Sequence, residues 1–283
     1  MLREKIKQLS AQYFEEYRAI RQHLHAHPEL SYQEYNTSKF VRDHLTHLGI
    51  PFTVMAETGV IGIIEGKRSN RVIALRADMD ALPIQEKNDV PYASTIPGIM
   101  HACGHDVHTT CLLGAARMLH ELRNEWDGTI KLIFQPAEEG YAGAKAMIKD
   151  GVLDGVDFIY GIHLWSYEPL GVIGVSEGPI MAASDRWYID CLGKGGHGAA
   201  PQGTVDAIVE AASVITALQT VVSRNVPPLE SGVVTCGTIK GGYAYNIIAD
   251  KVEICGTCRS FKPDVQELIK SRRCSPGVSS PSN

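Results

Sequence analysis

The stretch T-I-K-L-I-F-Q-P-A-E-E-G, Thr129 to Gly140, joins a run of apolar residues to a pair of carboxylates. The run from Thr129 to Phe134 is short and rich in isoleucine, and a proline follows it closely, which is typical of a buried strand. Similar runs lie at residues 60–65, 72–77 and 158–163, and helical patterns at 106–122 and 142–149 separate the later ones. Strands that alternate with helices predict an α/β sandwich.

Side chains of the kind that bind metals follow three of these predicted strands. Glu138 and Glu139 come directly after the first, the segment R-A-D-M-D-A-L-P (Arg76 to Pro83) follows the run at 72–77, and His163 ends the run at 158–163. In open α/β sheets the reactive groups collect at the carboxyl edge. A lone histidine at a strand end is more often a core residue, but three such ends from one sheet predict a shared site.

The segment H-A-C-G-H-D-V-H, His101 to His108, holds three imidazoles, a thiol and a carboxylate within eight residues. This ligand density favours metal binding. The alternative is a set of polar residues at a helix start, with Asp106 as the cap. The adjacent Glu138 and Glu139 point in different directions, so one can bind a metal while the other addresses a water molecule. A solvated glutamate pair at a helix N-terminus is the alternative there.

A second pattern begins near Ser184. It predicts a strand at 186–192, a glycine-rich loop, a helix at 205–222, strands at 232–239 and 250–261, and a helix from about Pro263. This order is most of a split β-α-β unit. We therefore predict three regions: a first domain at 1–183, a second domain at 184–271 and a disordered tail at 272–283.

Composition and charge favour a protein that acts on small molecules. The formal net charge is −5 and no basic cluster is present, so binding to nucleic acid or to an acidic membrane surface is not expected. No run approaches the roughly 20 apolar residues that span a bilayer. Residues 1–17 predict an amphipathic helix and lack the apolar core of a signal peptide. The seven cysteines are odd in number and unevenly spread, which suits a reducing compartment, and we expect a cytoplasmic protein.

Six segments together resemble the family of N-acyl amino acid amidohydrolases, hippurate hydrolases and auxin-conjugate hydrolases. These enzymes belong to the wider aminoacylase and carboxypeptidase group of two-metal metallopeptidases. The resemblance runs in order from about residue 18 to residue 270. The segments are L-H-x-H-P-E-L-S (24–31), R-A-D-M-D-A-L-P (76–83), H-A-C-G-H-D (101–106), P-A-E-E-G (136–140), G-I-H (161–163) and G-K-G-G-H-G-A-x-P (193–201).

The resemblance implies that residues 1–183 form a catalytic, metal-binding metallopeptidase sandwich domain. It implies that residues 184–271 form an inserted ferredoxin-like α+β lid and dimerisation domain, and that both domains are incomplete. It also implies two divalent metal ions, manganese, zinc, cobalt or nickel. Glu138 would be the general base, and Asp80 the carboxylate that orients a ligand from behind. The implied metal ligands are Cys103, His105, Glu139 and His163.

His197 and Asn246 match lid residues that contact the substrate, and the lid implies a homodimer or a larger assembly. The implied reaction is hydrolysis of the amide bond of a small N-acyl amino acid to a carboxylic acid and a free amino acid. A dipeptidase or carboxypeptidase of the same group is the near alternative.

The resemblance also implies a departure. Members of the family continue beyond the point at which this sequence ends, and that segment supplies one more histidine ligand. We therefore expect a weakly active or inactive chain. A non-catalytic remnant that dimerises through its lid is a further alternative, and the metal content of the protein would separate it from an enzyme.

Overall fold

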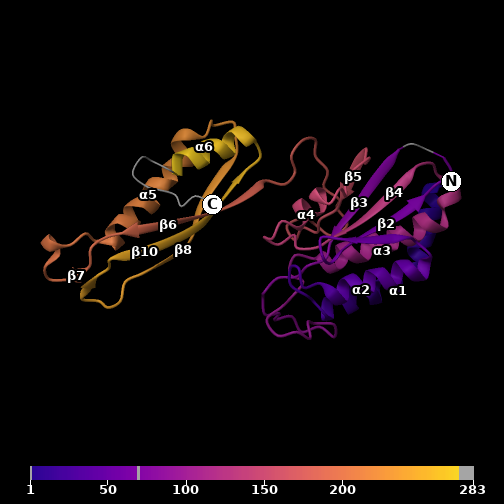
Figure 1. Ribbon diagram of the computed structural model, residues 1–283, viewed down its shortest axis with the longest axis horizontal. Helices are drawn as coiled ribbons and strands as arrows, with labels where there is room; N and C mark the ends of the chain where they lie inside the picture. Colours follow the sequence, from indigo (N-terminus) through magenta and orange to yellow (C-terminus); the bar gives the residue numbers. More distant parts are fainter. Residues whose placement is uncertain (1, 69–70, 274–283) are drawn as a thin grey trace. The chain divides into compact units, whose positions relative to one another are not determined.

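The computed structural model describes residues 2–68 and 71–273 of the chain (Figure 1). The chain divides into two compact units, Met1–Pro169 and Leu170–Asn283. This division lies ahead of the boundary predicted between residues 183 and 184. The predicted tail starts at Arg272, inside helix α6 (Pro263–Arg273), and its remainder, residues 274–283, lies outside the described residues.

The first unit is built on a mixed sheet of five strands in the order β1-β2-β4-β3-β5. Strands β3, β4 and β5 are parallel, whereas β2 runs antiparallel to both β1 and β4. The parallel strands therefore end at the same edge of the sheet. The elements of this unit are α1 (Leu2–Ala26), α2 (Tyr35–Leu48), β1 (Phe52–Met55), β2 (Gly59–Glu65), β3 (Val72–Asp78), α3 (His105–Glu121), the 3₁₀ turn η1 (Arg123–Glu125), β4 (Thr129–Gln135), α4 (Gly143–Lys149) and β5 (Phe158–Gly161).

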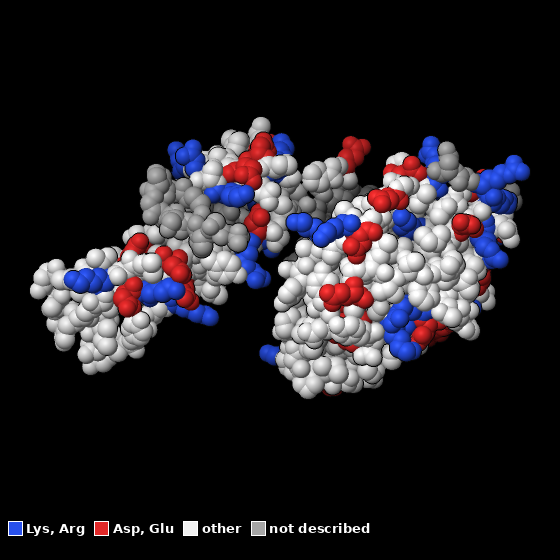
Figure 2. All heavy atoms as spheres, viewed as in Figure 1, with Lys and Arg blue, Asp and Glu red and all other residues white. Residues whose placement is uncertain are grey.

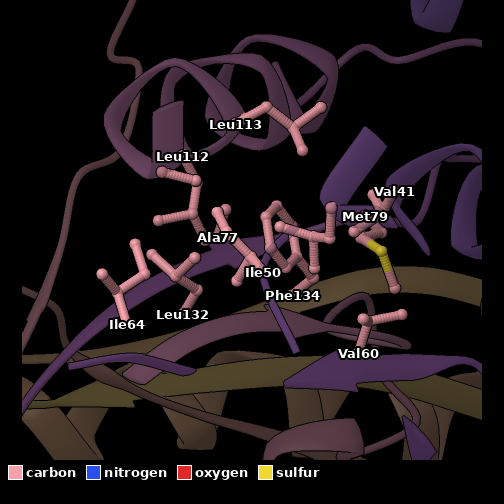
Figure 3. Packing of buried hydrophobic residues seen from close by; sticks show 12 residues of the cluster. Val41, Ile50, Val60, Ile64, Ala77, Met79, Leu112, Leu113, Leu132 and Phe134 are labelled. Carbon is pink, nitrogen blue, oxygen red and sulfur yellow. The ribbon is translucent and has the colours of Figure 1, made fainter. Parts of the chain in front are cut away.

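Side chains alternate between the two faces of this sheet, as the period of a strand requires. Leu132 and Phe134 of β4 point into the main core, where they meet Leu113 of α3 and Val41 of α2 (Figure 3). Ile133, between them, belongs to a smaller core on the opposite face, which helix α4 helps to cover. Both faces of the sheet are thus covered, and the mixed α/β class predicted from the sequence is confirmed.

The sequence patterns did not predict α2 or β1. Helix α2 buries Val41 and Leu45 completely and ends at Gly49, whose φ of +70° is the left-handed conformation that glycine adopts without steric cost. The amides of Gly49 and Ile50 return to the carbonyls of Thr46 and Leu45. This closure directs the chain into β1 and places α2 on the same core as α3.

The second unit contains a three-stranded antiparallel sheet in the order β6-β10-β8 and two helices. Helix α5 starts after Asp206, whose carboxylate accepts the amides of Ile208 and Val209, as an N-cap residue does. The predicted order of strand, helix, two strands and helix is present. The elements are β6 (Ala183–Leu192), β7 (Gly196–His197), the 3₁₀ turn η2 (Pro201–Gly203), α5 (Ala207–Asn225), β8 (Gly232–Gly241), β9 (Ile247–Ile248), β10 (Lys251–Ser260) and α6.

Helix α5 is the one described helix that is long and apolar enough to cross a membrane, by length and composition alone. One face of this helix is buried in the core of the second unit, through Ala207, Ala211, Leu218 and Val221. Acidic and basic side chains lie interspersed on the face of the molecule drawn in Figure 2. Neither sign gathers into a patch among the described residues of that face.

Candidate metal centre

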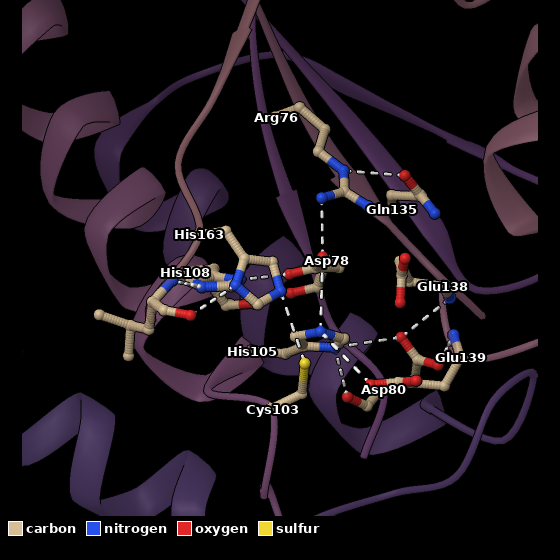
Figure 4. A network of polar contacts seen from close by, with 12 residues as sticks. Arg76, Asp78, Asp80, Cys103, His105, His108, Gln135, Glu138, Glu139 and His163 are labelled. Atoms are coloured by element: carbon tan, nitrogen blue, oxygen red, sulfur yellow. Dashed lines mark hydrogen bonds and ion pairs between the residues drawn. The ribbon is translucent and has the colours of Figure 1, made fainter. Parts of the chain in front are cut away.

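The carboxyl ends of the three parallel strands bring distant parts of the sequence together (Figure 4). The chain leaves β3 through Asp78 and reaches Asp80, it leaves β4 toward the Glu138–Glu139 pair, and it leaves β5 toward His163. The N-terminus of α3 adds His105 and, just before it, Cys103. All four predicted metal ligands therefore lie in the first unit, at the edge of the sheet that the sequence predicted.

The ligand atoms of these side chains lie within a few ångströms of one another. The Sγ atom of Cys103 is 3.5 Å from Nε2 of His163, and Nε2 of His105 is 3.9 Å from Oε1 of Glu139. Cys103, His105 and His163 form one group whose ligand atoms all lie within 4.8 Å of one another, and His105, Glu138 and Glu139 form a second. His105 belongs to both groups, so they adjoin.

The other ring nitrogen of each histidine ligand is fixed by a backbone carbonyl. Nδ1 of His105 lies 2.8 Å from the carbonyl oxygen of Asp80, and Nδ1 of His163 lies 2.6 Å from that of Leu164. A carbonyl only accepts, so Nδ1 carries the proton in both rings and Nε2 is directed into the cluster. This is the arrangement that metal-binding histidines commonly have.

One fully buried nitrogen in this cluster, Nε2 of His105, has no hydrogen-bond partner among the described residues. It lies 3.5 Å from Oδ2 of Asp78, which itself forms an ion pair with Arg76 at 2.7 Å. Buried polar groups are nearly always satisfied in folded proteins. Thiolate, imidazole and carboxylate are the donors that bind zinc and similar divalent cations. The residues present therefore fit a metal ion.

Charge is concentrated in the buried part of the site. Burial alone would raise the pKa of Asp78, but its hydrogen bond with His108 and the positive charges of His105 and Arg76 hold the pKa well below its usual range. Burial alone would lower the pKa of His105, yet Asp80, Cys103 and Asp78 outweigh it and raise the pKa to about 11. Glu138 differs, because partial burial and then the charges of Glu139 and Asp78 raise its pKa.

Asp78 and His108 form a link that the sequence patterns did not single out. Nδ1 of His108 lies 2.6 Å from Oδ1 of Asp78, and Nε2 of His108 accepts the amide of Leu164 at 2.9 Å. Arg76 lies 2.7 Å from the other oxygen of Asp78 and donates to Gln135. His108 thus ties the residue after His163 to the end of β3, and its position one helical turn after His105 was the available signal.

Two of the three histidines in the segment from residue 101 to residue 108 share one environment. His105 and His108 both lie against Asp78, and the three residues form a further group whose ligand atoms lie within 4.8 Å of one another. His105 faces the metal cluster and His108 binds Asp78, whereas His101 lies beside His25, with ring centroids 6.4 Å apart. His101 is buried, neither ring nitrogen has a hydrogen-bond partner among the described residues, and burial lowers its pKa to about 4. It does not belong to the metal cluster. Asp106 instead accepts from Arg21 and pairs with His25.

We expect His101 to make the metal-free protein sensitive to acid. Its pKa is about 4 in the folded state against an ordinary value of 6.5, so its contribution to stability is complete above pH 6.5 and is lost as the pH falls toward 4. At pH 4.5 the loss amounts to about 2–3 kcal/mol. His101→Phe should remove this part of the pH dependence, measured in EDTA as the change in the free energy of urea unfolding between pH 7 and pH 4.5.

The pH dependence of stability must be compared between variants because other groups near His101 also titrate differently in the folded protein. The pKa of His25, which contacts Asp106 and Glu86, is raised, so its contribution has the opposite sign. Subtracting the His101→Phe curve from the wild-type curve isolates His101. His47→Phe, on the exposed side of α2, is the matched control. An unchanged slope in His101→Phe would show that this imidazole does not titrate as the structure indicates.

His197 and Asn246, predicted to contact substrate, lie together in the second unit. His197 ends β7, which pairs with β9, and the amide of Gly198 donates to the carbonyl oxygen of Asn246 at 2.8 Å. Both residues are exposed, and the Nδ1 atom of His197 accepts the amide of Ala199. The structure therefore brings these two residues together at one short antiparallel ladder, in which His197 pairs with Ile247, the residue after Asn246.

The chain is similar to known proteins in sequence and in fold. N-acetyl-L-cysteine deacetylase of Bacillus subtilis (strain 168) is 49% identical over 89% of this chain and 61% of its own length. N-acyl-L-amino acid amidohydrolase of Geobacillus stearothermophilus is 47% identical over 95% of this chain and 73% of its own length. The crystal structure of the Bacillus subtilis YxeP protein, described as a dinuclear metal binding peptidase from the M20 family, superposes with a TM-score of 0.76 at 39% identity, over 93% of this chain and 68% of that one.

This chain thus spans 61% to 73% of the length of these three relatives. The sequence model of peptidase family M20/M25/M40 matches residues 74–265, which include the strand ends and the start of α3 that carry the candidate metal ligands. The match also covers most of the second unit. The chain belongs to peptidase family M20/M25/M40.

Proposed function

We propose that this protein is a metal-dependent hydrolase that cleaves the amide bond of N-acyl amino acids. The observation that carries the proposal is the convergence of Cys103, His105, Glu139 and His163 on one sheet edge, with the buried Nε2 of His105 unpaired. These four residues would hold two divalent ions. The names of the two bacterial relatives support the substrate class, because one is a deacetylase of N-acetyl-L-cysteine and the other an amidohydrolase of N-acyl-L-amino acids.

Glu138 is the residue proposed to move the proton. Bound divalent cations would supply a water molecule of lowered pKa and would polarise the carbonyl of the scissile amide. Glu138 takes a proton from the attacking water and then delivers it to the leaving amine nitrogen. Its raised pKa suits both steps, since a base that must also act as an acid works best with a pKa near the working pH.

Asp80 is proposed to fix the positions of the base and of two metal ligands relative to one another. One of its carboxylate oxygens accepts the amide of Glu138 and the other accepts the amide of Glu139. The Nδ1 atom of His105 lies 2.8 Å from the Asp80 carbonyl oxygen and 3.4 Å from Oδ1. A single buried residue thus contacts the base and two proposed metal ligands.

The second unit is proposed to act as the lid and to carry the surface through which two copies associate. His197 and Asn246 would contact the substrate from this unit, and their placement at one ladder supports a joint role. We propose a cytoplasmic enzyme that works on small molecules.

We expect metal binding to stabilise the folded protein, and Cys103 to be required for it. At a Mn²⁺ concentration about 100 times the Kd, the gain is about 2.7 kcal/mol, visible as a higher melting temperature that EDTA reverses. Cys103→Ala should bind at least one ion fewer per chain, measured by elemental analysis, and should lose most of the shift. Cys111→Ala, at an exposed position of α3, is the control. Equal metal content in Cys103→Ala and wild type would contradict the assignment.

The substrate class is tested by hydrolysis of a panel of N-acetyl and N-benzoyl amino acids with added Mn²⁺, alongside unmodified dipeptides. Release of free amino acid from the acylated compounds, and not from the dipeptides, is the expected result. Preferential cleavage of the dipeptides would instead indicate a dipeptidase. Binding of no metal by the folded protein would indicate that the cluster has no catalytic role in this chain.

A further inference from the structure

Three consecutive backbone amides at the end of β4 are held by two buried carboxylates. The amide of Ala137 donates to Oε1 of Glu34 at 2.8 Å. The next two amides, of Glu138 and Glu139, donate to the two oxygens of Asp80 at 3.0 and 2.9 Å. The proposed base, the proposed metal ligand after it and the residue before them are therefore each anchored through the backbone amide.

Ala137 has an unusual backbone conformation. Its φ is +50°, in the left-handed region that residues with a Cβ atom rarely adopt. Ala137 is also fully buried and directly precedes Glu138. Because the dihedral angles of residue 137 set the direction in which the chain continues, they determine where the next two carboxylates point. An alanine held in this region requires support from its surroundings.

Glu34 provides that support from a distant part of the sequence. It precedes α2, is fully buried, and its second oxygen accepts the hydroxyl of Thr58 at 2.7 Å. A buried carboxylate is costly unless it is hydrogen-bonded, and here one of its two oxygens is committed to the turn. Glu34 belongs to none of the candidate metal-binding groups found among the described residues.

The packing around the turn leaves little room for adjustment. A Cβ atom on Gly143 would lie 1.8 Å from the carbonyl oxygen of Pro136, and one on Gly59 would lie 3.0 Å from the Pro136 ring. Both glycines therefore allow close approach to the residue before Ala137. The backbone of the turn is thus closely packed at Pro136 and hydrogen-bonded to Glu34 at Ala137.

We propose that Glu34 is a positioning residue for hydrolysis: its carboxylate holds Ala137 in the left-handed conformation and thereby aims Glu138 and Glu139. The proposal rests on the proposed function, in which Glu138 is the base and Glu139 a metal ligand. In this role Glu34 acts through the backbone of Ala137, because it is fully buried and its two oxygens accept from Ala137 and Thr58. Its removal should lower kcat more than it changes KM, because it misplaces the base without removing a substrate contact.

The test compares Glu34→Ala with Glu34→Gln and with a double variant. Glu34→Ala should lower kcat with an N-acetyl amino acid and Mn²⁺ by about 10- to 100-fold, with KM changed by no more than about twofold. Glu34→Gln still offers an oxygen to the Ala137 amide and should stay within about threefold of wild type. Adding Ala137→Gly to Glu34→Ala should restore about tenfold of the loss, because glycine takes positive φ without an anchor.

Ala142→Gly is the matched control, because Ala142 also has a positive φ, of +55°, in the next turn. It should give no rescue of Glu34→Ala.

A second measurement needs no turnover. Amide hydrogen exchange of the segment 135–140 should become at least about tenfold faster in Glu34→Ala and remain slow in Glu34→Gln. Glu34→Ala should also bind Mn²⁺ more weakly, because Glu139 is misplaced.

These readouts separate this proposal from the function itself. If Glu138→Gln abolishes turnover while Glu34→Ala keeps its kcat within about twofold, or if Ala142→Gly rescues as well as Ala137→Gly, the positioning role is wrong and the hydrolase assignment stands. If the wild-type chain does not hydrolyse any substrate, exchange and Mn²⁺ affinity still decide about Glu34. Unchanged exchange and unchanged Mn²⁺ affinity in a folded Glu34→Ala would overturn the proposal.

Discussion

Replacing Glu138 by glutamine is expected to lower kcat by about 10³-fold without loss of bound metal. Glutamine has the size of glutamate but accepts no proton at neutral pH. The backbone amide of residue 138 remains available to Asp80, so the turn should keep its shape. A variant that folds normally, binds two ions per chain and no longer releases amino acids would place the proton transfer on this side chain.

Metal content decides between two roles for Glu138. Its carboxylate lies in a group with Glu139 and His105 whose ligand atoms are all within 4.8 Å of one another, so coordination by Glu138 is a real competitor to acid–base chemistry. A drop from two ions to one in Glu138→Gln would favour the ligand role. Glu65→Gln, at an exposed position at the end of β2, is the control for the loss of one negative charge and should leave turnover unchanged.

The sequence predicted strands β2 to β5 and the edge of the sheet at which the candidate metal ligands lie, because both depend on local patterns. An isoleucine-rich run such as Thr129–Gln135 forms a strand in almost any α/β context, and parallel strands must end at one edge. The meeting of residues 60 positions apart, such as Cys103 and His163, follows from that topology. The choice of Cys103, His105, Glu139 and His163 among the polar residues at this edge came from the family resemblance and not from the local patterns.

Other features depend on tertiary contacts that no local pattern carries. Helix α2 was missed because its buried face carries few apolar residues. Beside Val41 and Leu45 it buries Thr37 and Ser38, so the apolar period of a helix is weak in its sequence. The separation of His101 from His105 was missed because ligand density in a sequence does not indicate which way each ring points. Glu34 reads as an ordinary glutamate before a helix, and only the fold brings it to Ala137.

The second large effect is expected for Asp80→Asn, on stability as well as on turnover. The two carboxylate oxygens of Asp80 accept the amides of Glu138 and Glu139, and the hydroxyl of Ser31 donates to one of them at 2.7 Å. In asparagine one of these oxygens becomes an NH₂ group, which is a donor. One backbone amide in a buried site would then face a donor and lose its acceptor.

We expect this change to reduce the free energy of unfolding by about 3 kcal/mol at pH 7 in EDTA, because an unsatisfied buried group carries its full desolvation cost. Asp43→Asn is the matched control: Asp43 pairs with Lys39 on the surface of α2 and is 63% exposed, so its loss should cost about 0.5 kcal/mol or less. Urea unfolding of the three proteins measures both effects.

The pH dependence gives the same prediction an independent check. Burial alone would raise the pKa of Asp80, but its hydrogen bonds with His105, Ser31 and the two amides outweigh this and lower it. A carboxyl whose pKa is lower in the folded state than in the unfolded chain contributes stability above the unfolded value of about 4 and loses it as the pH falls through the folded value. The gap between wild type and Asp80→Asn should therefore be widest near neutrality and should narrow in acid. A gap that stays below about 1 kcal/mol at pH 7, or one that widens in acid, would mean that Asp80 does not hold the turn as its ionised form.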